Sequence, residues 1–286
     1  MGRLDHETPD IEDDYNIIKK LGEGAYGTVY KVSPKKSPKQ IYALKLIKIL
    51  DWDTYSNTEK EFKLLQTLGD KCKQGLVCYH KLFYTYYKKE QYIGLLMDYV
   101  EGYELFEYIL KHCKNRNSDL TSKEIYKIML HLVKTLKILH DNDLVHRDIK
   151  PENIIYNLDQ MILIDYGTLC NPKNCDGVVG TAIYLSPELA NSYIGKGHMN
   201  PDMYKKSDIW ALGVTFYFLV NCDFPFGKND PDKIGLKSFA KYLSSCKIKK
   251  SDGPDDYLAE VIDLMLTCNY KERPTIDEIL CVLEKY

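Results

Sequence analysis

The hydrophobic pattern of the chain changes character near Gly102, from short β-rich runs to amphipathic helical stretches. Between Tyr15 and about Leu96, the runs YNIIKKL, TVYKV and IYALKLI are typical of strands, separated by glycines and by the turn-like SPKKSPKQ. One helical stretch interrupts these strands, at about 54–68. A small β-rich part before a larger helical part predicts an α+β fold, with a cleft between the two parts as the expected ligand site.

Two capping boxes mark helix starts in the second part. Thr121 with Glu124 precedes a long helix, and Thr275 with Glu278 precedes the last one. The long helix is predicted to be amphipathic, because its apolar residues recur at helical spacing: Ile125, Ile128, Leu132, Leu136 and Leu139.

Length and charge limit the classes of function. The 286 residues suit one large domain or two lobes, and the net charge of -2 gives no electrostatic reason to expect nucleic acid or a membrane surface as a partner. The longest apolar run, Ala211–Val220, is too short to span a bilayer. Residues 1–14 are polar and acidic without an apolar leader, so we expect a flexible N-terminal tail.

The nine cysteines are scattered, and no CxxC pair occurs among them. Zinc-ligand spacing is therefore missing. We expect a reduced intracellular protein, located in the cytoplasm or the nucleus.

A glycine-rich motif lies between the first two predicted strands. It consists of Gly22, Glu23, Gly24, Ala25, Tyr26 and Gly27, with Val29 two residues further on. Glycines let the backbone approach phosphate oxygens closely and offer N–H groups to them. On its own, the motif fits a plain glycine-rich hairpin equally well, and the strand that follows it argues against a dinucleotide-binding loop.

Lys45 lies on the third predicted strand. Alone, such a lysine is usually a solvated strand residue, but next to a glycine-rich hairpin it can neutralise phosphate charge. Glu61 on the intervening helix is the expected carboxylate partner, with Glu59 as a competitor and a surface charge as the simpler alternative.

The most specific motif follows the long helix. His146-Arg147-Asp148-Ile149-Lys150-Pro151-Glu152-Asn153 places a candidate base, a cation and a metal-binding amide close together, and Asp165-Tyr166-Gly167 follows the apolar run MILI. Here the chain resembles the eukaryotic protein kinase superfamily, in the form of a Ser/Thr protein kinase catalytic domain. The segment Gly102–Phe106 is weakly similar to calcium/calmodulin-dependent kinases.

Three further segments carry the resemblance, which covers about 15–284. Gly180–Glu188 resembles the segment that docks peptide substrates in the family. Asp208–Gly213 resembles the buried helix of its large lobe, and Arg273 resembles the arginine that pairs with Glu188.

The resemblance implies ATP and Mg²⁺ as cofactors and assigns the catalytic roles. Asp148 would orient the substrate hydroxyl and Lys150 would steady the γ-phosphate. Asn153 and Asp165 would hold Mg²⁺, while Lys45 and Glu61 would complete the phosphate clamp.

The resemblance also implies an adenine and ribose pocket. Met97 falls at the gatekeeper position, the backbone of Asp98 and Val100 would hydrogen-bond the base, and Glu104 would reach the ribose. The residues that would enclose the ring are Leu21, Val29, Ala43, Ile155 and Ile164.

The implied architecture is a bilobal kinase fold over 15–286. A small lobe at 15–97 would hold a five-stranded antiparallel sheet and one helix, a hinge would occupy 98–102, and a mainly α-helical lobe would occupy 103–286. The substrate would be a protein Ser or Thr hydroxyl, since Lys150 opens the Ser/Thr-type run, and we expect a monomer.

The activation segment, 168–179, contains no Ser or Tyr and only Thr168. We therefore expect activity without activation-loop phosphorylation, with Asp176 as a weak substitute for phosphate beside Arg147. Thr181 is interpreted as a structural partner of Asp148 and Lys150. Cys170 and Cys175 are expected to be free surface thiols rather than a redox switch.

Two other classes of function remain. A pseudokinase-type ATP-binding scaffold would be expected to lack Lys45, Asp148, Asn153 or Asp165, and all four are present. A kinase-like small-molecule phosphotransferase would generally lack the docking segment that ends at Glu188.

Overall fold

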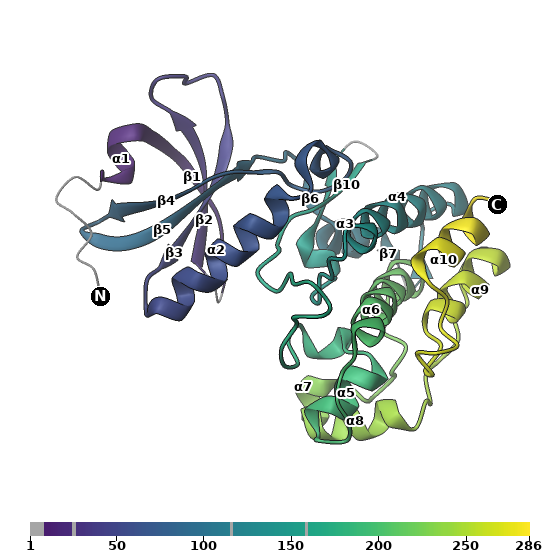
Figure 1. Cartoon of the computed structure of the whole chain (residues 1–286). Helices are drawn as coiled ribbons and strands as arrows, with labels where there is room; N and C mark the ends of the chain where they lie inside the picture. The colour runs from purple at the N-terminus through teal and green to yellow at the C-terminus, as the bar shows by residue number, and fades with distance from the viewer. Residues whose placement is uncertain (1–8, 25–26, 115–116, 158–159) are drawn as a thin grey trace. The chain divides into compact units, whose positions relative to one another are not determined.

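The computed structural model describes residues 9–24, 27–114, 117–157 and 160–286 (Figure 1). The chain forms two compact units, Met1–Glu101 (unit 1) and Gly102–Tyr286 (unit 2). Ala25 and Tyr26 of the glycine-rich motif lie outside the described residues.

Unit 1 is built on strands with two α-helices and one 3₁₀ helix among its described residues. In chain order they are α1 (Ile11–Asp14), β1 (Tyr15–Gly24), β2 (Gly27–Pro34), β3 (Tyr42–Lys48), α2 (Trp52–Gln66), the 3₁₀ helix η1 (Gly69–Lys73), β4 (Tyr79–Tyr87) and β5 (Glu90–Asp98). Helix α2 begins two residues earlier than predicted because the carboxylate of Asp51 caps it, accepting the N–H of Thr54 at 2.7 Å.

The strands form one antiparallel sheet in the order β1-β2-β3-β5-β4. Strand β3 lies in the middle and is buried from Ala43 to Ile47, as expected for a strand covered on both faces. Helix α2 packs against β4. The predicted five-stranded antiparallel sheet is confirmed.

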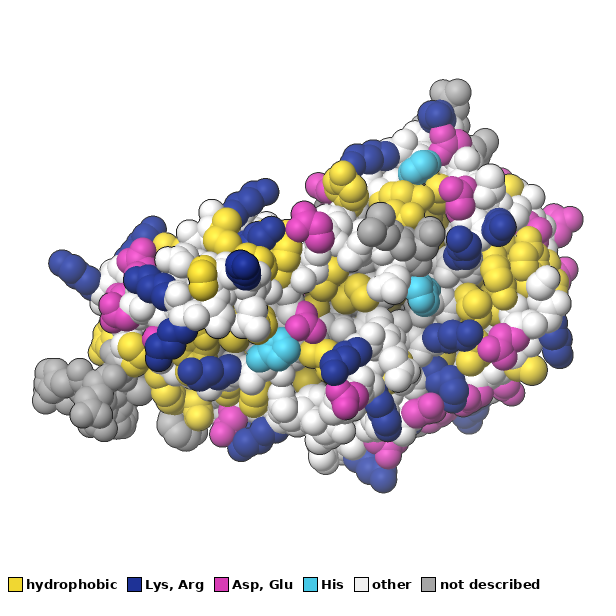
Figure 2. Space-filling view, turned by 90° about the horizontal axis from the view of Figure 1, so that it is seen from above, with side chains coloured by type: hydrophobic (Ala, Val, Ile, Leu, Met, Phe, Trp, Pro, Cys, Tyr) yellow, Lys and Arg dark blue, Asp and Glu magenta, His cyan; other side chains and the backbone are white. Residues whose placement is uncertain are grey.

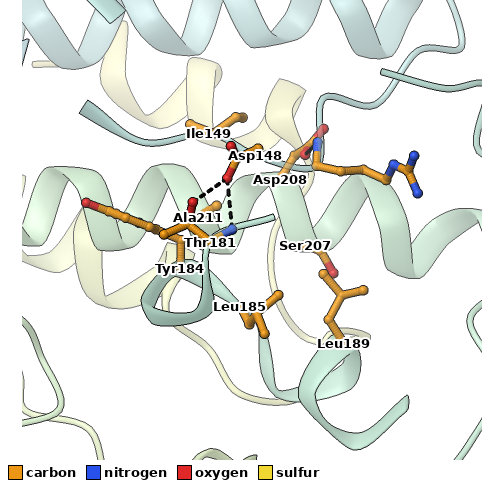
Figure 3. A pocket seen from close by; sticks show the side chains of 10 residues that line it. Asp148, Ile149, Thr181, Tyr184, Leu185, Leu189, Ser207, Asp208 and Ala211 are labelled. Atoms are coloured by element: carbon orange, nitrogen blue, oxygen red, sulfur yellow. Dashed lines mark hydrogen bonds between the residues drawn. The ribbon is translucent and has the colours of Figure 1, made fainter. Parts of the chain in front are cut away.

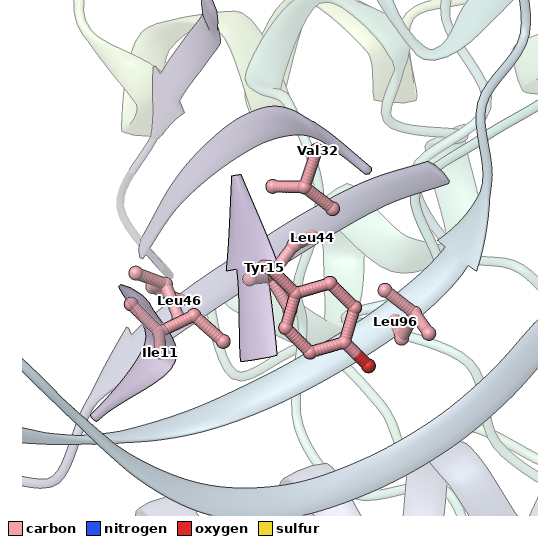
Figure 4. Packing of buried hydrophobic residues seen from close by; sticks show 6 residues of the cluster. All are labelled: Ile11, Tyr15, Val32, Leu44, Leu46 and Leu96. Atoms are coloured by element: carbon pink, nitrogen blue, oxygen red, sulfur yellow. The ribbon is translucent and has the colours of Figure 1, made fainter. Parts of the chain in front are cut away.

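The first described residues do not form a loose tail. Ile11 lies in a buried cluster with side chains of the sheet: Tyr15, Val32, Leu44, Leu46 and Leu96 (Figure 4). The carbonyl of Pro9 accepts the N–H of Tyr86 at 3.1 Å. The flexible tail predicted for 1–14 is therefore wrong for 9–14, because one apolar side chain in an acidic segment fixes it on the sheet.

Unit 2 is mainly helical. Its described elements are β6 (Tyr103–Glu104), α3 (Leu105–His112), β7 (Cys113–Lys114), β8 (Asn117–Ser118), α4 (Ser122–Asp141), η2 (Pro151–Asn153), β9 (Ile154–Asn157), β10 (Gln160–Leu163), η3 (Ala182–Tyr184), α5 (Pro187–Tyr193), α6 (Pro201–Asn221), α7 (Pro231–Ile234), α8 (Leu236–Ser244), α9 (Asp256–Met265) and α10 (Ile276–Leu283).

Helix α6 is the core of unit 2. Every residue from Lys206 to Asn221 is buried, because α4, α5 and α9 pack around the helix. Both predicted capping boxes are present, at the starts of α4 and α10. The apolar run in α6 is a core helix, and among the described residues no helix is both long and apolar enough to cross a bilayer.

Four disulfides pair eight of the nine cysteines, and the exposed Cys281 is the remaining one. The pairs are Cys72–Cys78, Cys113–Cys222, Cys170–Cys175 and Cys246–Cys268. The prediction that Cys170 and Cys175 are free surface thiols is therefore wrong. The pairing depends on how the fold brings distant or looped segments together, which spacing alone does not show. The pairing differs from the reduced state of the cysteines that we expected.

Charges of both signs are interspersed over the face of the molecule drawn in Figure 2. This mixture agrees with the net charge of -2.

The anchoring of α1 can be tested with two isoleucines of unit 1. Ile11 is 1% exposed and Ile18 is 50% exposed. Replacement of Ile11 by Ala should lower the free energy of unfolding by about 2–4 kcal/mol, because it leaves a cavity in the cluster. Ile18→Ala should change it by about 0.5 kcal/mol or less. Urea unfolding measures both, and equal effects would show that residues 9–14 are loosely held after all.

Candidate active site

A buried carboxylate fixes the loop that carries Asp148. Asp208 on α6 is 1% exposed, and its Oδ2 and Oδ1 accept the backbone N–H groups of His146 and Arg147, each at 2.8 Å. The Nε2 atom of His140 lies 3.1 Å from Oδ2. Arg147 has a positive φ of 69°, which non-glycine residues rarely adopt. The two backbone bonds to Asp208 hold the loop in this conformation.

The carboxylate of Asp148 is oriented by donors from three residues. Its Oδ1 accepts from the backbone N–H of Thr181 at 2.9 Å and from the hydroxyl at 2.8 Å (Figure 3). Its Oδ2 lies 3.0 Å from Nζ of Lys150 and accepts from Nδ2 of Asn153 at 3.2 Å. Asp148 and Lys150, predicted to act on the same phosphoryl group, are thus adjacent.

Thr181 connects the two charged residues. Its hydroxyl accepts from Nζ of Lys150 at 2.7 Å and donates to Asp148. The predicted structural role of Thr181 is confirmed. Gly180 has a φ of 101°, and a Cβ there would lie 2.4 Å from the carbonyl oxygen of Arg147, so only glycine permits this close approach.

Asn153 and Asp165 lie at the two ends of the β9–β10 hairpin. The N–H of Ile164 donates to the carbonyl of Asn153 at 3.0 Å, which brings Asp165 next to it. The Nδ2 group of Asn153 donates to Asp148, to its carbonyl at 2.8 Å and to Oδ2, so the amide oxygen faces away. Oδ1 of Asp165 accepts the N–H of Gly167 at 3.3 Å.

These oxygen donors fit a hard divalent cation. Mg²⁺ usually takes one or two protein carboxylates and completes its shell with substrate phosphates and water. In the described ranges, no group of three or more His, Cys, Asp or Glu side chains gathers around a possible metal position. The amide and carboxylate oxygens of Asn153 and Asp165 are therefore suited to a cation shared with a phosphate rather than to an all-protein cage.

Tyr166 and Thr168 hold the backbone behind Asp148. The Tyr166 hydroxyl donates to the carbonyl of Leu163 at 2.6 Å, so the polar group that Tyr adds at this position has its partner. The hydroxyl of Thr168 donates to the carbonyl of His146 at 2.7 Å. His146 is fully buried, and this burial lowers the pKa of its imidazole.

A small pocket lies within unit 2 beside Asp148. Figure 3 shows its lining, which consists of Arg147, Asp148, Ile149, Thr181, Tyr184, Leu185, Leu189, Ser207, Asp208 and Ala211. Burial raises the pKa of Tyr184, and the negative charges of Glu152 and Asp148 add to this. Burial likewise raises the pKa of Glu152. Within the described part of the chain, the Tyr184 hydroxyl and Oε2 of Glu152 have no hydrogen-bond partner.

Glu188, the last residue of the segment Gly180–Glu188, forms a buried ion pair with Arg273. Nη1 of Arg273 lies 2.7 Å from Oε1 of Glu188, and Nη2 donates to Oε2 at 3.1 Å. The predicted pairing is confirmed. Two parallel bonds of this kind fix the geometry of both side chains.

In unit 1, Lys45 and Glu61 are buried charges. Lys45 on β3 is 7% exposed and Glu61 on α2 is 8% exposed. The Tyr79 hydroxyl donates to Oε1 of Glu61 at 2.7 Å. Neither residue is the solvated surface charge that was the simpler alternative. Glu59, the competing carboxylate, instead pairs with Lys63 at 2.9 Å on the outer side of α2.

The described residues of the glycine-rich motif lie on β1 and β2, which pair with each other. Gly27 has a φ of 135°, and a Cβ there would lie 2.3 Å from the carbonyl oxygen of Leu46, so the close strand approach requires glycine. Gly22 and Gly24 lie on β1, where an added Cβ would meet no atom within 4 Å. Glu23 pairs with Thr28 across the hairpin.

Two pairs of the residues expected around a base are neighbours in a sheet, one pair in each unit. In unit 1, Ala43 and Met97 are buried and face each other in the β3–β5 register, while Leu21 is exposed. The N–H of Asp98 donates to the carbonyl of Cys78 at 3.0 Å. In unit 2, Glu104 pairs with Ile155 in the β6–β9 register.

Sequence reasoning missed the role of Asp208 as the anchor of the loop. It was noted only as part of a helix that resembles the family. The sequence did contain one signal for this role. Asp208 lies beside a long apolar run, and a carboxylate that is buried with such a run needs hydrogen-bond partners.

Comparisons of the sequence with known proteins found a matching family profile and several similar proteins. A family profile described as "Protein kinase domain" matches residues 15–282. The chain is 32% identical over 281 residues to "Calcium-dependent protein kinase 5" of Plasmodium berghei, covering 95% of the chain and 46% of that protein. It is 28% identical over 301 residues to "Serine/threonine-protein kinase PKH3" of Saccharomyces cerevisiae, covering 93% and 31%.

A third relative is closer in size. The chain is 31% identical over 226 residues to "Probable cAMP-dependent protein kinase catalytic subunit" of Encephalitozoon cuniculi, covering 77% of the chain and 64% of that protein. The chain spans less than half the length of the Plasmodium and yeast relatives.

The buried imidazole of His146 predicts how stability depends on pH. Its pKa in the folded protein is lowered from the ordinary 6.5, so below that pH the unfolded chain binds a proton that the folded chain does not. Stability should therefore fall as the pH drops below the unfolded pKa, by up to about 1.4 kcal/mol per pH unit from this group.

His146→Asn, which keeps a side-chain acceptor but removes the titration, should make the slope shallower over this range. His198→Asn at an exposed position is the control and should keep the wild-type slope. Urea unfolding at a series of pH values measures the slopes, and identical slopes for wild type and His146→Asn would contradict the assignment.

Proposed function

The chain belongs to the protein kinase family, and we propose that it acts as a Ser/Thr protein kinase that transfers the γ-phosphate of ATP to protein hydroxyls. The observation that carries the proposal is the Asp148 carboxylate, held by Thr181, Lys150 and Asn153. Phosphoryl transfer requires mainly positioning and stabilisation of charge from the protein, and this arrangement would supply both.

Asp148 would orient the acceptor hydroxyl and accept its proton. Lys150, 3.0 Å from the Asp148 carboxylate, would stabilise the charge that develops on the transferred phosphoryl group. Thr181 would keep the two side chains at this separation, because its hydroxyl bonds to both.

Asn153 and Asp165 would hold Mg²⁺ through their amide and carboxylate oxygens. The bound ion would neutralise the β- and γ-phosphate oxygens. The hydrogen bonds from Nδ2 of Asn153 to Asp148 support this role, because they fix the side chain with its amide oxygen directed away from Asp148.

Unit 1 would hold the nucleotide. Lys45 would bind the α- and β-phosphates, Glu61 would position it, and the β1–β2 hairpin at Gly22, Glu23, Gly24 and Gly27 would cover the phosphates. The burial of Lys45 and Glu61 supports the roles proposed for them, since a lysine and a glutamate are seldom buried without a defined role. Within unit 1, the base would contact Leu21, Val29, Ala43, Met97, Asp98 and Val100. Glu104, Ile155 and Ile164, which the family resemblance assigns to the same ligand, belong to unit 2.

Specificity for Ser and Thr is supported by two observations. The run from Lys150 to Asn153 resembles the Ser/Thr-kinase form, and Lys150 donates a hydrogen bond to the Thr181 hydroxyl. One similar protein carries Ser/Thr kinase activity in its name.

Activity would not require phosphorylation of the activation segment. Thr168, the only hydroxyl residue of 168–179, is buried and donates to the carbonyl of His146. Arg147 donates from Nε to the carbonyl of Thr168 at 2.7 Å and from Nη1 to the carbonyl of Asp176 at 2.9 Å. Backbone carbonyls thus occupy donors that would otherwise bind a phosphate.

The proposal is tested by ³²P transfer from ATP to generic protein substrates. Asp148→Asn should lower kcat by about a hundredfold or more, because the base that orients the hydroxyl is lost. Asp143→Asn, an exposed neighbour whose positive φ asparagine tolerates, should keep the wild-type rate.

The label should appear on Ser and Thr and not on Tyr. Wild-type protein that binds ATP without transferring phosphate would instead be a pseudokinase-type scaffold. Transfer to small molecules alone would indicate the second alternative, a small-molecule phosphotransferase.

A further inference from the structure

We propose that the Cys170–Cys175 disulfide is a covalent modification that holds the activation segment in its working arrangement and makes the kinase active only when oxidised. The inference rests on the proposed function, because it concerns regulation of the same site. Phosphorylated activation loops are ordered by new contacts to arginine, and this segment has no accessible hydroxyl residue for that purpose.

One end of the disulfide is tied to the loop of Asp148. Cys170 forms an isolated antiparallel bridge with Val145: its N–H donates to the Val145 carbonyl at 3.1 Å and its carbonyl accepts from the Val145 N–H at 2.9 Å. Val145 directly precedes His146, whose N–H is held by Asp208. Cys170 therefore has a fixed position relative to the catalytic residues.

The other end positions the backbone that Arg147 binds. Cys175 is followed by Asp176, whose carbonyl accepts from Nη1 of Arg147 at 2.9 Å. The Tyr204 hydroxyl donates to the carbonyl of Cys175 at 3.3 Å. The Cα atoms of Cys170 and Cys175 are 5.6 Å apart, so the disulfide closes the polar turn between them.

The disulfide is also part of an apolar cluster that joins several elements of unit 2. The buried members are Val145, Leu185, Leu189 and Tyr204, and the partly buried ones are Cys170, Cys175, Val178, Met199 and Leu236. Leu185 belongs to the docking segment and Val178 precedes Gly180. Two separate thiols would not be linked to each other, so the turn between them could move away from this cluster on reduction.

The disulfide would affect catalysis through the backbone that leads from Cys175 to Thr181. Gly180 lies against the carbonyl of Arg147, and Thr181 holds both Asp148 and Lys150. Loss of the crosslink frees the turn at 171–174 and so weakens the placement of the backbone that leads from Cys175 to Thr181 and the docking segment. Binding of ATP depends on other residues and should change little.

The redox step is thiol–disulfide exchange with a small-molecule disulfide, such as glutathione disulfide. A Cys170 or Cys175 thiolate attacks it, releases one reduced thiol and forms a mixed disulfide. The second protein thiolate then displaces the other thiol, so the protein loses two electrons and two protons and two reduced thiols are formed. Both cysteines are partly exposed, so such a reagent can reach them.

The test compares two double variants. Cys170→Ser/Cys175→Ser should lower kcat/KM for a protein substrate by about tenfold or more. Its KM for ATP should stay within about twofold of wild type. Cys246→Ser/Cys268→Ser removes another disulfide of unit 2 and is the matched control, with kcat/KM expected to remain at the wild-type value.

Reduction of the wild-type chain provides an independent readout if the first variant folds poorly. Activity should fall in step with reduction of Cys170 and Cys175, followed by differential alkylation and mass spectrometry, and should return with glutathione disulfide. Intact mass should show no phosphate on the active oxidised protein.

The inference is overturned if the active wild-type enzyme keeps its kcat/KM when this pair is reduced or replaced by serine. It is equally overturned if both double variants lose activity to the same extent, which would indicate a general loss of stability. Absence of phosphate transfer by oxidised wild type would instead contradict the proposed function itself.

Discussion

The arrangement of the site depends on the pairing of the Asp208 carboxylate with the backbone N–H groups of His146 and Arg147. A carboxylate buried to this degree is stable only when its oxygens are hydrogen-bonded, and removing the partners of such a charge typically costs about 3–5 kcal/mol. Because α6 is buried along most of its length, Asp208 has little freedom to move. The loop must therefore adopt the conformation that satisfies it, including the positive φ of Arg147.

The other interactions of the site follow from that conformation. The fixed loop presents Asp148 to Thr181, and Gly180 can approach the loop only because it has no side chain. Arg147 then meets two carbonyls of the activation segment, where the Cys170–Cys175 disulfide closes the turn. One continuous set of contacts thus connects the core helix of unit 2 with the segment proposed to control activity.

Sequence patterns predicted those features whose signal is local or strongly typical of the family. The capping box at Thr121 was predicted because it depends on residue type at a fixed spacing. The pairing of Glu188 with Arg273 and the role of Thr181 were predicted from the resemblance to the kinase family. The docking of Ile11, the anchor at Asp208 and the four disulfides were not. Each of these depends on which distant segments the fold brings together, and a sequence read without its contacts does not contain that information. The roles assigned to the individual site residues stay predictions.

The central claim is that Asp208 sets the conformation of the loop, and amide hydrogen exchange tests it most directly. In Asp208→Asn, the N–H groups of His146 and Arg147 should exchange at least about tenfold faster than in the wild type, while the amides of β3 and β5 keep their protection. Asp202→Asn, at the exposed start of the same helix, should leave all of them unchanged. Unchanged protection of His146 and Arg147 in Asp208→Asn would contradict the account.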